Sequence, residues 1–155
     1  MLKTLPRLWR ILPMWFHVLA ARVVRPKFGV AVAALIFDEG GRVLLFKHTY
    51  RKFQWGIPAG GLEHREKPEN AIIREFFEET GMHIQVERLL RAESAREAPV
   101  VSLIYLCSIV SGTFKESLEI SEMKYFALND LPFMLIAEKN LIRSVAENLT
   151  LQSIT

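Results

Sequence analysis

Three glutamates in the stretch REFFEETG have the residue type and the spacing to bind a cation. Glu75, Glu78 and Glu79 stand three and four residues apart, so on a helix they share one face. Like charges at this spacing destabilise a helix, and negative charge near its C-terminal end opposes the helix dipole. A solvated face selected for stability would carry lysine or arginine there. Because Mg²⁺ prefers carboxylate oxygens and would offset this charge, the pattern favours a metal site.

Neighbouring residues could hold the glutamate face and a cation in place. Arg74 adjoins the acidic face and can pair with Glu78 one turn on, or reach back to the loop residue Glu66. A pair with Glu66 would tie the loop to the helix. Gly60 and Gly61 let the backbone of this loop approach a cation closely, so a carbonyl oxygen there could become a further ligand.

The surrounding chain predicts a helix that carries these glutamates and strands on either side of it. Pro68 suits the first position of a helix, and Gly81 suits the residue just past its end. Between them runs an apolar stripe that is expected to dock on a sheet: Ala71, Ile72, Ile73, Phe76 and Phe77.

Strand signals precede and follow this helix. Residues 28–37 and 42–48 are predicted as a hairpin joined by the turn 38–41. Later strands are predicted over 83–92, 100–110 and 123–128, and a C-terminal amphipathic helix over 137–148. This order of elements predicts an α/β fold with a mixed sheet covered by helices on both faces.

Charge divides the chain into two parts. The 155 residues have a net charge of +3, but residues 1–27 hold six basic residues and no acidic one. The remainder, 28–155, is predicted to be a single domain and has 14 basic against 17 acidic residues. Because a nucleic-acid-binding fold usually carries a basic patch on its surface, this balance argues against nucleic acid as a partner. The single cysteine, Cys107, excludes an intrachain disulfide and fits a cytoplasmic protein.

The basic segment 1–27 has aromatic residues among its arginines, which predicts an amphipathic helix. Its uncharged centre, 11–21, has 11 residues, whereas a membrane-spanning helix needs about 20. Three roles stay open. The segment could pack against this domain or a second copy in a homodimer, residues 1–25 could contact a membrane surface peripherally, or the segment could be a targeting sequence.

The stretch 60–82 resembles the Nudix box, G-x5-E-x7-R-E-U-x-E-E-x-G-U, in which U is a bulky apolar residue. The seven fixed positions are filled by Gly60, Glu66, Arg74, Glu75, Glu78, Glu79 and Gly81. The two U positions are filled by Phe76 and Met82, and the preceding WGIPAGG resembles the Trp-x-x-Pro-x-Gly-Gly sequence common in the family. A complete match of this kind by accident is rare.

The resemblance implies a fold, an activity and a cofactor. Nudix proteins fold as an α/β/α sandwich and hydrolyse a diphosphate linkage in a nucleoside diphosphate joined to another group, X. An Mg²⁺-dependent hydrolase is therefore expected, with Mn²⁺ as a substitute cation. By position, the metal ligands would be Glu75, Glu78, Glu79 and the carbonyl of Gly60. Arg74 and Glu66 match the orienting pair of the box.

The residue that activates the attacking water has two candidate positions. In some members of the family it is a glutamate of the box, which corresponds to Glu75, and in others it lies in a later loop. The segment KESLEISEM offers Glu116, Glu119 and Glu122 there. Glu119 is the first choice, because a glutamate at this point is common in the family, whereas the other two fit a solvated face.

Residues that follow the second predicted strand are candidates for substrate binding. His48, Tyr50 and Arg51 could bind a diphosphate or stack on a base, although an exposed polar loop accounts for them equally well. Trp55 fits either a structural residue or a wall of the pocket. Pro99, 17 residues after Met82, resembles a proline near this distance in many ADP-ribose-cleaving members, which favours ADP-ribose or a nucleotide sugar.

Other functions stay open beside this one. Clearance of nucleoside triphosphates, oxidised ones included, and cleavage at the 5′ end of RNA are alternative reactions within the same family. A non-catalytic nucleotide sensor belongs to a different class of function. Members that have lost catalysis typically lose glutamates of the box, and all of them are present here.

Overall fold

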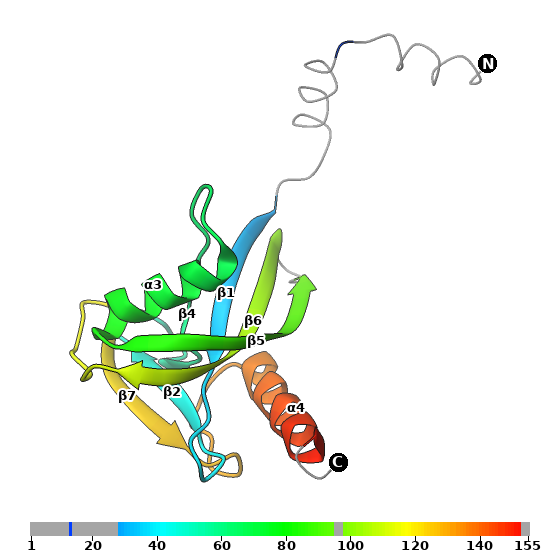
Figure 1. The fold of residues 1–155 in the computed structure, drawn as a ribbon. Helices are drawn as coiled ribbons and strands as arrows, with labels where there is room; N and C mark the ends of the chain where they lie inside the picture. Colours follow the sequence, from blue (N-terminus) through cyan, green and yellow to red (C-terminus); the bar gives the residue numbers. More distant parts are fainter. Residues whose placement is uncertain (1–12, 14–27, 95–97, 153–155) are drawn as a thin grey trace.

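The computed structural model of the chain describes Pro13 and residues 28–94 and 98–152. In chain order its elements are β1 (Gly29–Leu35), β2 (Val43–His48), β3 (Trp55–Gly56), β4 (Ala59–Gly61), α3 (Pro68–Thr80), β5 (His83–Ser94), β6 (Val100–Ser111), β7 (Ile120–Phe126) and α4 (Ile136–Gln152) (Figure 1). The last strand therefore begins at Ile120 and not at Met123, and the last helix extends to Gln152. The predicted N-terminal amphipathic helix lies outside the described residues.

The strands form two sheets. The first has four strands in the order β4-β1-β6-β5, in which β1 and β6 are parallel and the other pairs are antiparallel. The second has three antiparallel strands in the order β3-β2-β7. The prediction of a mixed sheet is confirmed by the first of them.

The predicted hairpin between 28–37 and 42–48 forms only next to its turn. The turn itself forms, since the Gly41 N–H donates to the Asp38 carbonyl at 2.9 Å and Arg42 pairs with the Asp38 carboxylate at 2.6 Å. The strands part after a single bridge between Phe37 and Val43, and β1 and β2 enter different sheets. β1 has buried residues on both of its faces, so it takes an interior position between β4 and β6.

Helix α3 begins and ends where its sequence predicts. Pro68 is its first residue, where a missing N–H is tolerated. Gly81 follows its last residue with φ 70°, a left-handed conformation that glycine adopts without strain, and its N–H donates to the Phe77 carbonyl at 2.7 Å. These two ends fix which residues of the box lie on the helix.

Phe77 belongs to the predicted docking stripe but does not pack against the sheets. Ile72 and Phe76 are fully buried against the sheets, whereas Phe77 is 45% exposed and stacks on His83 with the ring centroids 4.7 Å apart. Phe77 lies one residue past Phe76, which is about 100° further around the helix. The prediction that Phe77 docks the helix is therefore wrong, and the buried stripe is narrower than expected.

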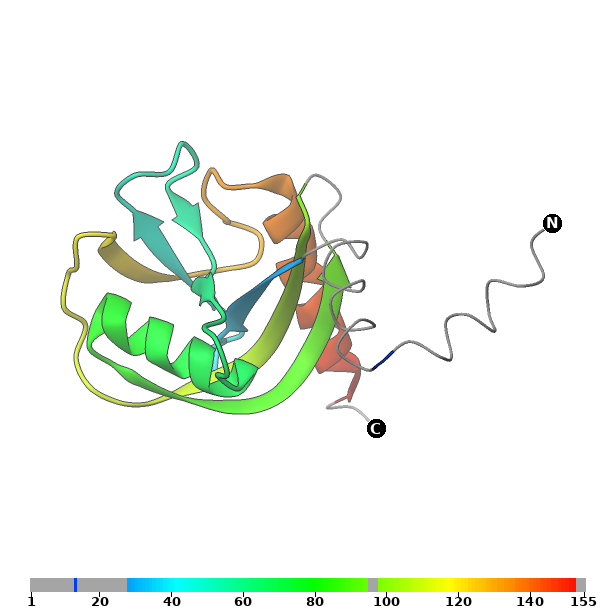
Figure 2. The same cartoon turned by 90° about the horizontal axis from the view of Figure 1, so that it is seen from above.

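Each of the two helices covers a hydrophobic cluster of its own. Alternate residues of β1 point to opposite sides, so Val32 and Ala34 join the cluster beneath α3, whereas Ala33 and Leu35 join the cluster beneath α4. Figures 1 and 2 show the two helices on different sides of the strands. The described part of the chain is thus a sandwich of helix, sheets and helix, as the family resemblance implies.

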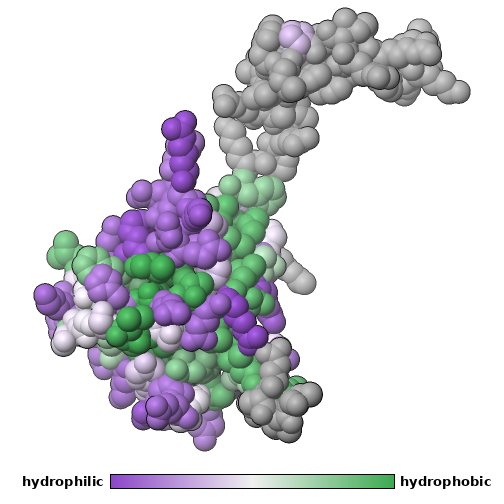
Figure 3. Space-filling view, viewed as in Figure 1, coloured by the Kyte–Doolittle hydropathy of each residue, from purple (hydrophilic) through white to green (hydrophobic). Residues whose placement is uncertain are grey.

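Some hydrophobic surface remains exposed beside β5, which is an edge strand of the four-stranded sheet. Figure 3 shows apolar side chains on this face of the molecule, between areas of polar surface. Leu89 of β5 and Val110 of β6 are 51% and 61% exposed. None of the helices in the described ranges is both long and apolar enough to span a bilayer.

Candidate active site

Helix α3 and the loop before β7 together form a pocket lined by carboxylates. Its volume is about 320 Å³, and its lining residues are Glu75, Glu78, Glu79, Ser117, Leu118 and Glu119. Three of the four carboxylates come from the helical face predicted from spacing. The fourth, Glu119, lies 40 residues further along the chain, and the fold brings it to the same pocket.

Arg74 ties the loop before α3 to the helix. Its Nε and Nη2 donate to the two oxygens of Glu66 at 3.0 and 2.9 Å, and Nη2 also donates to the Gly61 carbonyl at 3.0 Å. The Glu66 carboxylate accepts a further bond from the Glu63 N–H at 3.2 Å. These bonds hold the pKa of Glu66 below its ordinary value, with Arg74 as the main cause. The orienting pair implied by the Nudix box is therefore formed.

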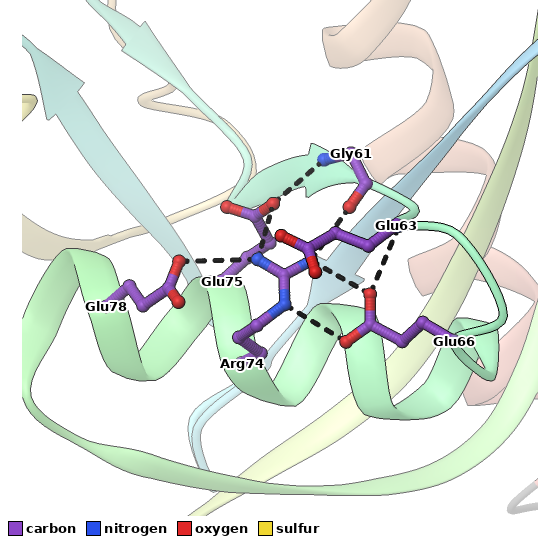
Figure 4. Close-up of polar contacts among 6 residues, drawn as sticks. All are labelled: Gly61, Glu63, Glu66, Arg74, Glu75 and Glu78. Carbon is purple, nitrogen blue, oxygen red and sulfur yellow. Dashed lines mark hydrogen bonds and ion pairs between the residues drawn. The ribbon is translucent and has the colours of Figure 1, made fainter.

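Arg74 also reaches the glutamates of the acidic face. Its Nη1 lies 3.0 Å from Glu75 and 3.3 Å from Glu78 (Figure 4). The predicted pairing with Glu78 therefore occurs together with the predicted pairing with Glu66, and the contact with Glu75 is additional. Glu66, and after it Glu75, raise the pKa of the Arg74 guanidinium above its ordinary value. Glu75 accepts a second bond from the Gly61 N–H at 3.0 Å. A side-chain carbon at Gly60 would collide with the Glu75 side chain, so glycine is required there by close approach.

Glu79 differs from its neighbours because its carboxylate is buried and one of its oxygens lacks a hydrogen bond in the described structure. Its side chain is 9% exposed, and Oε2 has no hydrogen-bond partner among the described residues. Burial is the main reason that its pKa is raised to about 7, and the negative charges of Glu75 and Glu119 raise it further. A buried carboxylate of this kind costs free energy unless a cation or a proton neutralises it.

The donor set fits a hard divalent cation. Four carboxylates line one pocket, and the buried oxygen of Glu79 is a free acceptor. In the described ranges, no three acidic, histidine or cysteine side chains form a ready-made metal shell. Glu75 and Glu78 instead turn toward Arg74. Binding of a cation would therefore require these two side chains to turn from Arg74 toward Glu79.

Ser117 is a residue of this pocket that the sequence analysis did not identify. Its hydroxyl oxygen accepts hydrogen bonds from the N–H groups of Glu119 and Ile120 at 3.3 and 3.0 Å. This local turn fixes the backbone that carries Glu119. A serine two residues before a glutamate at a strand start is a common turn signal, so the pattern was present but not distinctive. In contrast, Glu122 pairs with Lys47 at 3.5 Å, outside the residues that line this pocket.

The predicted substrate-binding residues occupy different environments. Tyr50 is 61% exposed and lies edge-on to His48, and the guanidinium carbon of Arg51 is 5.8 Å from the Tyr50 ring centroid. Arg51 is close enough to Glu79 that its positive charge partly offsets the rise in the pKa of that carboxyl. Trp55 packs edge-on against Phe126 with ring centroids 4.7 Å apart, which are the contacts of a structural residue.

His48 is fully buried, and neither ring nitrogen has a partner in the described part of the chain. Burial, and then the charge of Arg51, lower its pKa from 6.5 to about 4. Below pH 6.5 the unfolded chain binds this proton and the folded chain does not, so acid favours unfolding until about pH 4. We expect His48 to reduce the free energy of unfolding, between those two pH values, by on the order of 3 kcal/mol.

Urea unfolding of the wild type and of His48→Gln at several pH values would measure this contribution. Glu79, with its raised pKa, acts in the opposite direction in an overlapping range, so the difference between the two proteins isolates the histidine. The variant should lose less stability than the wild type as the pH falls from 6.5 to 4. Equal losses in both proteins would contradict a neutral, buried His48.

Known proteins share both the sequence pattern and the fold. The sequence model of the NUDIX domain matches residues 27–148. An ADP-ribose pyrophosphatase of Methanocaldococcus jannaschii is 29% identical over 120 residues, which cover 74% of this chain and 70% of that protein. An RNA pyrophosphohydrolase of Saccharophagus degradans is 38% identical over 58 residues, which cover 37% of this chain and 32% of that protein. The crystal structure of a UDP-X diphosphatase matches with a TM-score of 0.71 and 24% identity, covering 86% of this chain and 70% of that one, which shows a common fold.

The domain match extends over most of the chain and includes every residue of the carboxylate pocket. The relatives are pyrophosphatases, and divalent cations generally serve the reactions of this family. The box, the sandwich and the pocket agree with that match. This chain belongs to the Nudix hydrolase family.

Proposed function

We propose that the protein is an Mg²⁺-dependent hydrolase of a nucleoside diphosphate linked to another group, with ADP-ribose or a nucleotide sugar favoured as substrate. The observation that supports it most directly is Glu79, a buried carboxylate with an unpartnered oxygen in a pocket lined by three further carboxylates. A stable fold gains nothing from this arrangement, whereas a cation that bridges carboxylates and phosphate oxygens requires it.

The residues of the box hold the cation in this proposal. The ligands are Glu75, Glu78, Glu79 and the carbonyl of Gly60, and Mn²⁺ could substitute for Mg²⁺. A divalent cation bound there supplies positive charge to the phosphate oxygens and lowers the pKa of water. Arg74, held by Glu66, orients the loop and keeps Glu75 and Glu78 near the pocket in the absence of a cation.

Two groups outside the box complete the site. Glu119 lines the pocket near Glu79 and would accept the proton of the attacking water, a role for which Glu75 is the alternative. Arg51 and Tyr50 lie at the side of His48, where a guanidinium could bind a phosphate and an exposed aromatic ring could stack on a base. His48, whose ring lies edge-on to Tyr50, would support that residue.

A product analysis over a substrate panel tests this proposal. The full chain with Mg²⁺ would be given ADP-ribose, nucleotide sugars, dinucleoside polyphosphates and oxidised nucleoside triphosphates, and a coupled phosphatase would report new phosphomonoesters. We expect two phosphomonoesters from a nucleoside diphosphate derivative. Pyrophosphate and a monophosphate would instead support the triphosphate alternative. Binding without turnover would support a nucleotide sensor, and a strongly salt-dependent affinity for RNA would support RNA 5′-end cleavage.

For residues 1–27 we propose contact with a second copy or with an anionic membrane surface, in an otherwise cytoplasmic protein. Their six basic residues suit anionic lipid, and the exposed edge strand β5 offers a surface for a second copy. Vesicle co-sedimentation and light scattering of the full chain and of a truncation that starts at Lys27 would compare the two. A truncation that matches the full chain in mass and in vesicle binding would contradict both roles.

A further inference from the structure

Three hydrophobic side chains project into solvent from the segment that leads into α4. Phe133 and Ile136 are 74% and 76% exposed, and Leu135 is 45% exposed. Met134, which lies among them, is buried in the cluster beneath α4, so it anchors the segment and leaves its neighbours on the surface. Single exposed apolar residues are ordinary, whereas several in one place are typical of an interaction surface.

The loop after β2 adds an aromatic ring to this surface. Phe53 is half-buried and packs on Phe133, with the ring centroids 5.0 Å apart and the ring planes inclined by 41°. Figure 2 shows this loop, in teal, beside the orange segment between β7 and α4. Phe53, Phe133, Leu135 and Ile136 therefore form one surface, which we call the apolar patch.

Basic side chains flank the apolar patch. Arg51 and Lys52 directly precede its first residue, and Lys139 lies in the first turn of α4. Lys139 Nζ donates to a backbone carbonyl of the segment before α4 at 3.3 Å, so its charge stays beside the patch. Of the acidic residues in these two segments, Asp130 is exposed, whereas Glu138 is turned inward and accepts a bond from a backbone N–H next to β3 at 3.4 Å. Basic side chains therefore outnumber acidic ones around the patch.

The strongly basic segment 1–27 joins the domain within reach of this surface. Ala31 of β1 and Ala137 of α4 line one pocket between the four-stranded sheet and that helix. Phe28 precedes Ala31 by three residues, which is about 10 Å of extended chain. Segment 1–27 brings six basic residues and no acidic one to this side of the domain. An anionic surface that binds the apolar patch would attract this segment as well.

The loop after β2 links the apolar patch to the carboxylate pocket. At the start of this loop, the Thr49 N–H donates to the Glu119 carbonyl at 2.9 Å and the Thr49 hydroxyl donates to the Leu118 carbonyl at 2.8 Å. Leu118 and Glu119 line the pocket. Leu118 and Tyr50 are further exposed hydrophobic side chains on this side of the domain. A surface that covers the apolar patch would therefore lie beside the pocket.

We propose that the apolar patch docks the folded domain on an anionic lipid bilayer, with Phe133 and Ile136 inserted at the boundary between headgroups and acyl chains. Projecting apolar side chains with basic neighbours suit this boundary, because lysine and arginine can extend to the headgroups while the apolar side chains insert. A protein partner fits less well, since lysine is depleted at protein interfaces. The proposal goes beyond the membrane contact proposed for residues 1–27, because it assigns a surface of the domain itself, and it does not depend on hydrolysis.

Vesicle co-sedimentation of the full chain tests this docking surface, with vesicles of phosphatidylcholine alone and of phosphatidylcholine mixed with phosphatidylserine. The test variant combines Phe133→Ser with Ile136→Ser. The control variant combines Phe77→Ser with Val110→Ser, which removes an exposed aromatic and an exposed aliphatic side chain from α3 and β6 instead. We expect the wild type to prefer the mixed vesicles. The test variant should bind them at least about tenfold more weakly, which corresponds to about 1.4 kcal/mol, and the control variant should bind as the wild type does.

A second variant tests the charge beside the patch without changing its apolar side chains. Lys52→Glu alters an exposed residue, and it should weaken binding to the mixed vesicles while leaving binding to phosphatidylcholine alone unchanged.

The outcomes separate a bilayer from the other partners of this surface. Equal binding of the mixed vesicles by the wild type and the test variant would overturn the proposal and leave membrane contact to residues 1–27. Absence of binding by the wild type would overturn it as well. Unchanged vesicle binding with a lower mass in light scattering would identify an interface between copies instead. Unchanged vesicle binding with a raised KM for a nucleotide sugar would assign the patch to the substrate.

Discussion

Glu79→Gln is expected to reduce Mg²⁺-dependent hydrolysis by at least about 100-fold, because it removes the negative charge of the buried carboxylate in the pocket. Loss of a partner outside the ligand shell of a metal typically costs 10–100-fold, so loss of a ligand should cost more. The fold should tolerate the change, since Glu79 Oε2 makes no hydrogen bond in the described structure. Initial rates at saturating Mg²⁺ would measure the effect.

The stability of this variant distinguishes a metal role from a structural one. In the absence of metal, burial and neighbouring carboxylates disfavour the charged form of Glu79, so a neutral amide should not lower the unfolding midpoint at pH 8. Glu116→Gln changes an exposed residue in the loop before β7, outside the pocket lining, so it serves as the control and should keep full activity. Turnover of Glu79→Gln near the wild-type rate would contradict the assignment of Glu79 as a ligand.

Phe76→Ala is expected to lower the free energy of unfolding by about 3–5 kcal/mol, the range for truncation of a fully buried aromatic ring. Phe76 is 0% exposed and contacts Phe46, with the ring centroids 5.2 Å apart, in the cluster beneath α3. Equilibrium unfolding in urea would measure the loss. Phe76 lies beside Glu75 on α3. Molecules of the variant in which α3 no longer packs on the sheets should therefore also lose activity.

Phe77→Ala is the matched control for this prediction. The two residues are of the same type and adjacent in sequence, but Phe77 is 45% exposed and contacts His83 on the surface. Its truncation should cost less than about 1.5 kcal/mol, the upper value for an aromatic pair beyond area burial. Equal losses in the two variants would contradict the orientation of α3 on the sheets.

The helix of the box was predictable because local signals agree there. Pro68, Gly81 and the spacing of the apolar residues fix the ends of α3 and its docking face, and the same spacing gathers Glu75 and Glu79. Glu119 could be assigned only through the family resemblance. Its 40-residue separation from Glu79 gives no local signal of contact.

The failures concern long-range pairing and side-chain direction. The turn at Asp38 is real, but strand pairing depends on tertiary contacts: the partners of β1 are β4 and β6, and β6 lies about 70 residues later in the sequence. Phe77 shows that the buried face of a helix, when it is predicted from residue type, can include one residue too many.

The measurement that tests the central claim most directly is phosphorus NMR of ADP-ribose and of a nucleotide sugar incubated with the full chain. Spectra would be taken with Mg²⁺, with Mg²⁺ and excess chelator, and with Glu79→Gln. We predict that the diphosphate signals are replaced by two phosphomonoester signals only with the wild type and free Mg²⁺. Cleavage that persists with chelator or with Glu79→Gln, or intact diphosphate in every sample, would contradict a metal-dependent hydrolase centred on these glutamates.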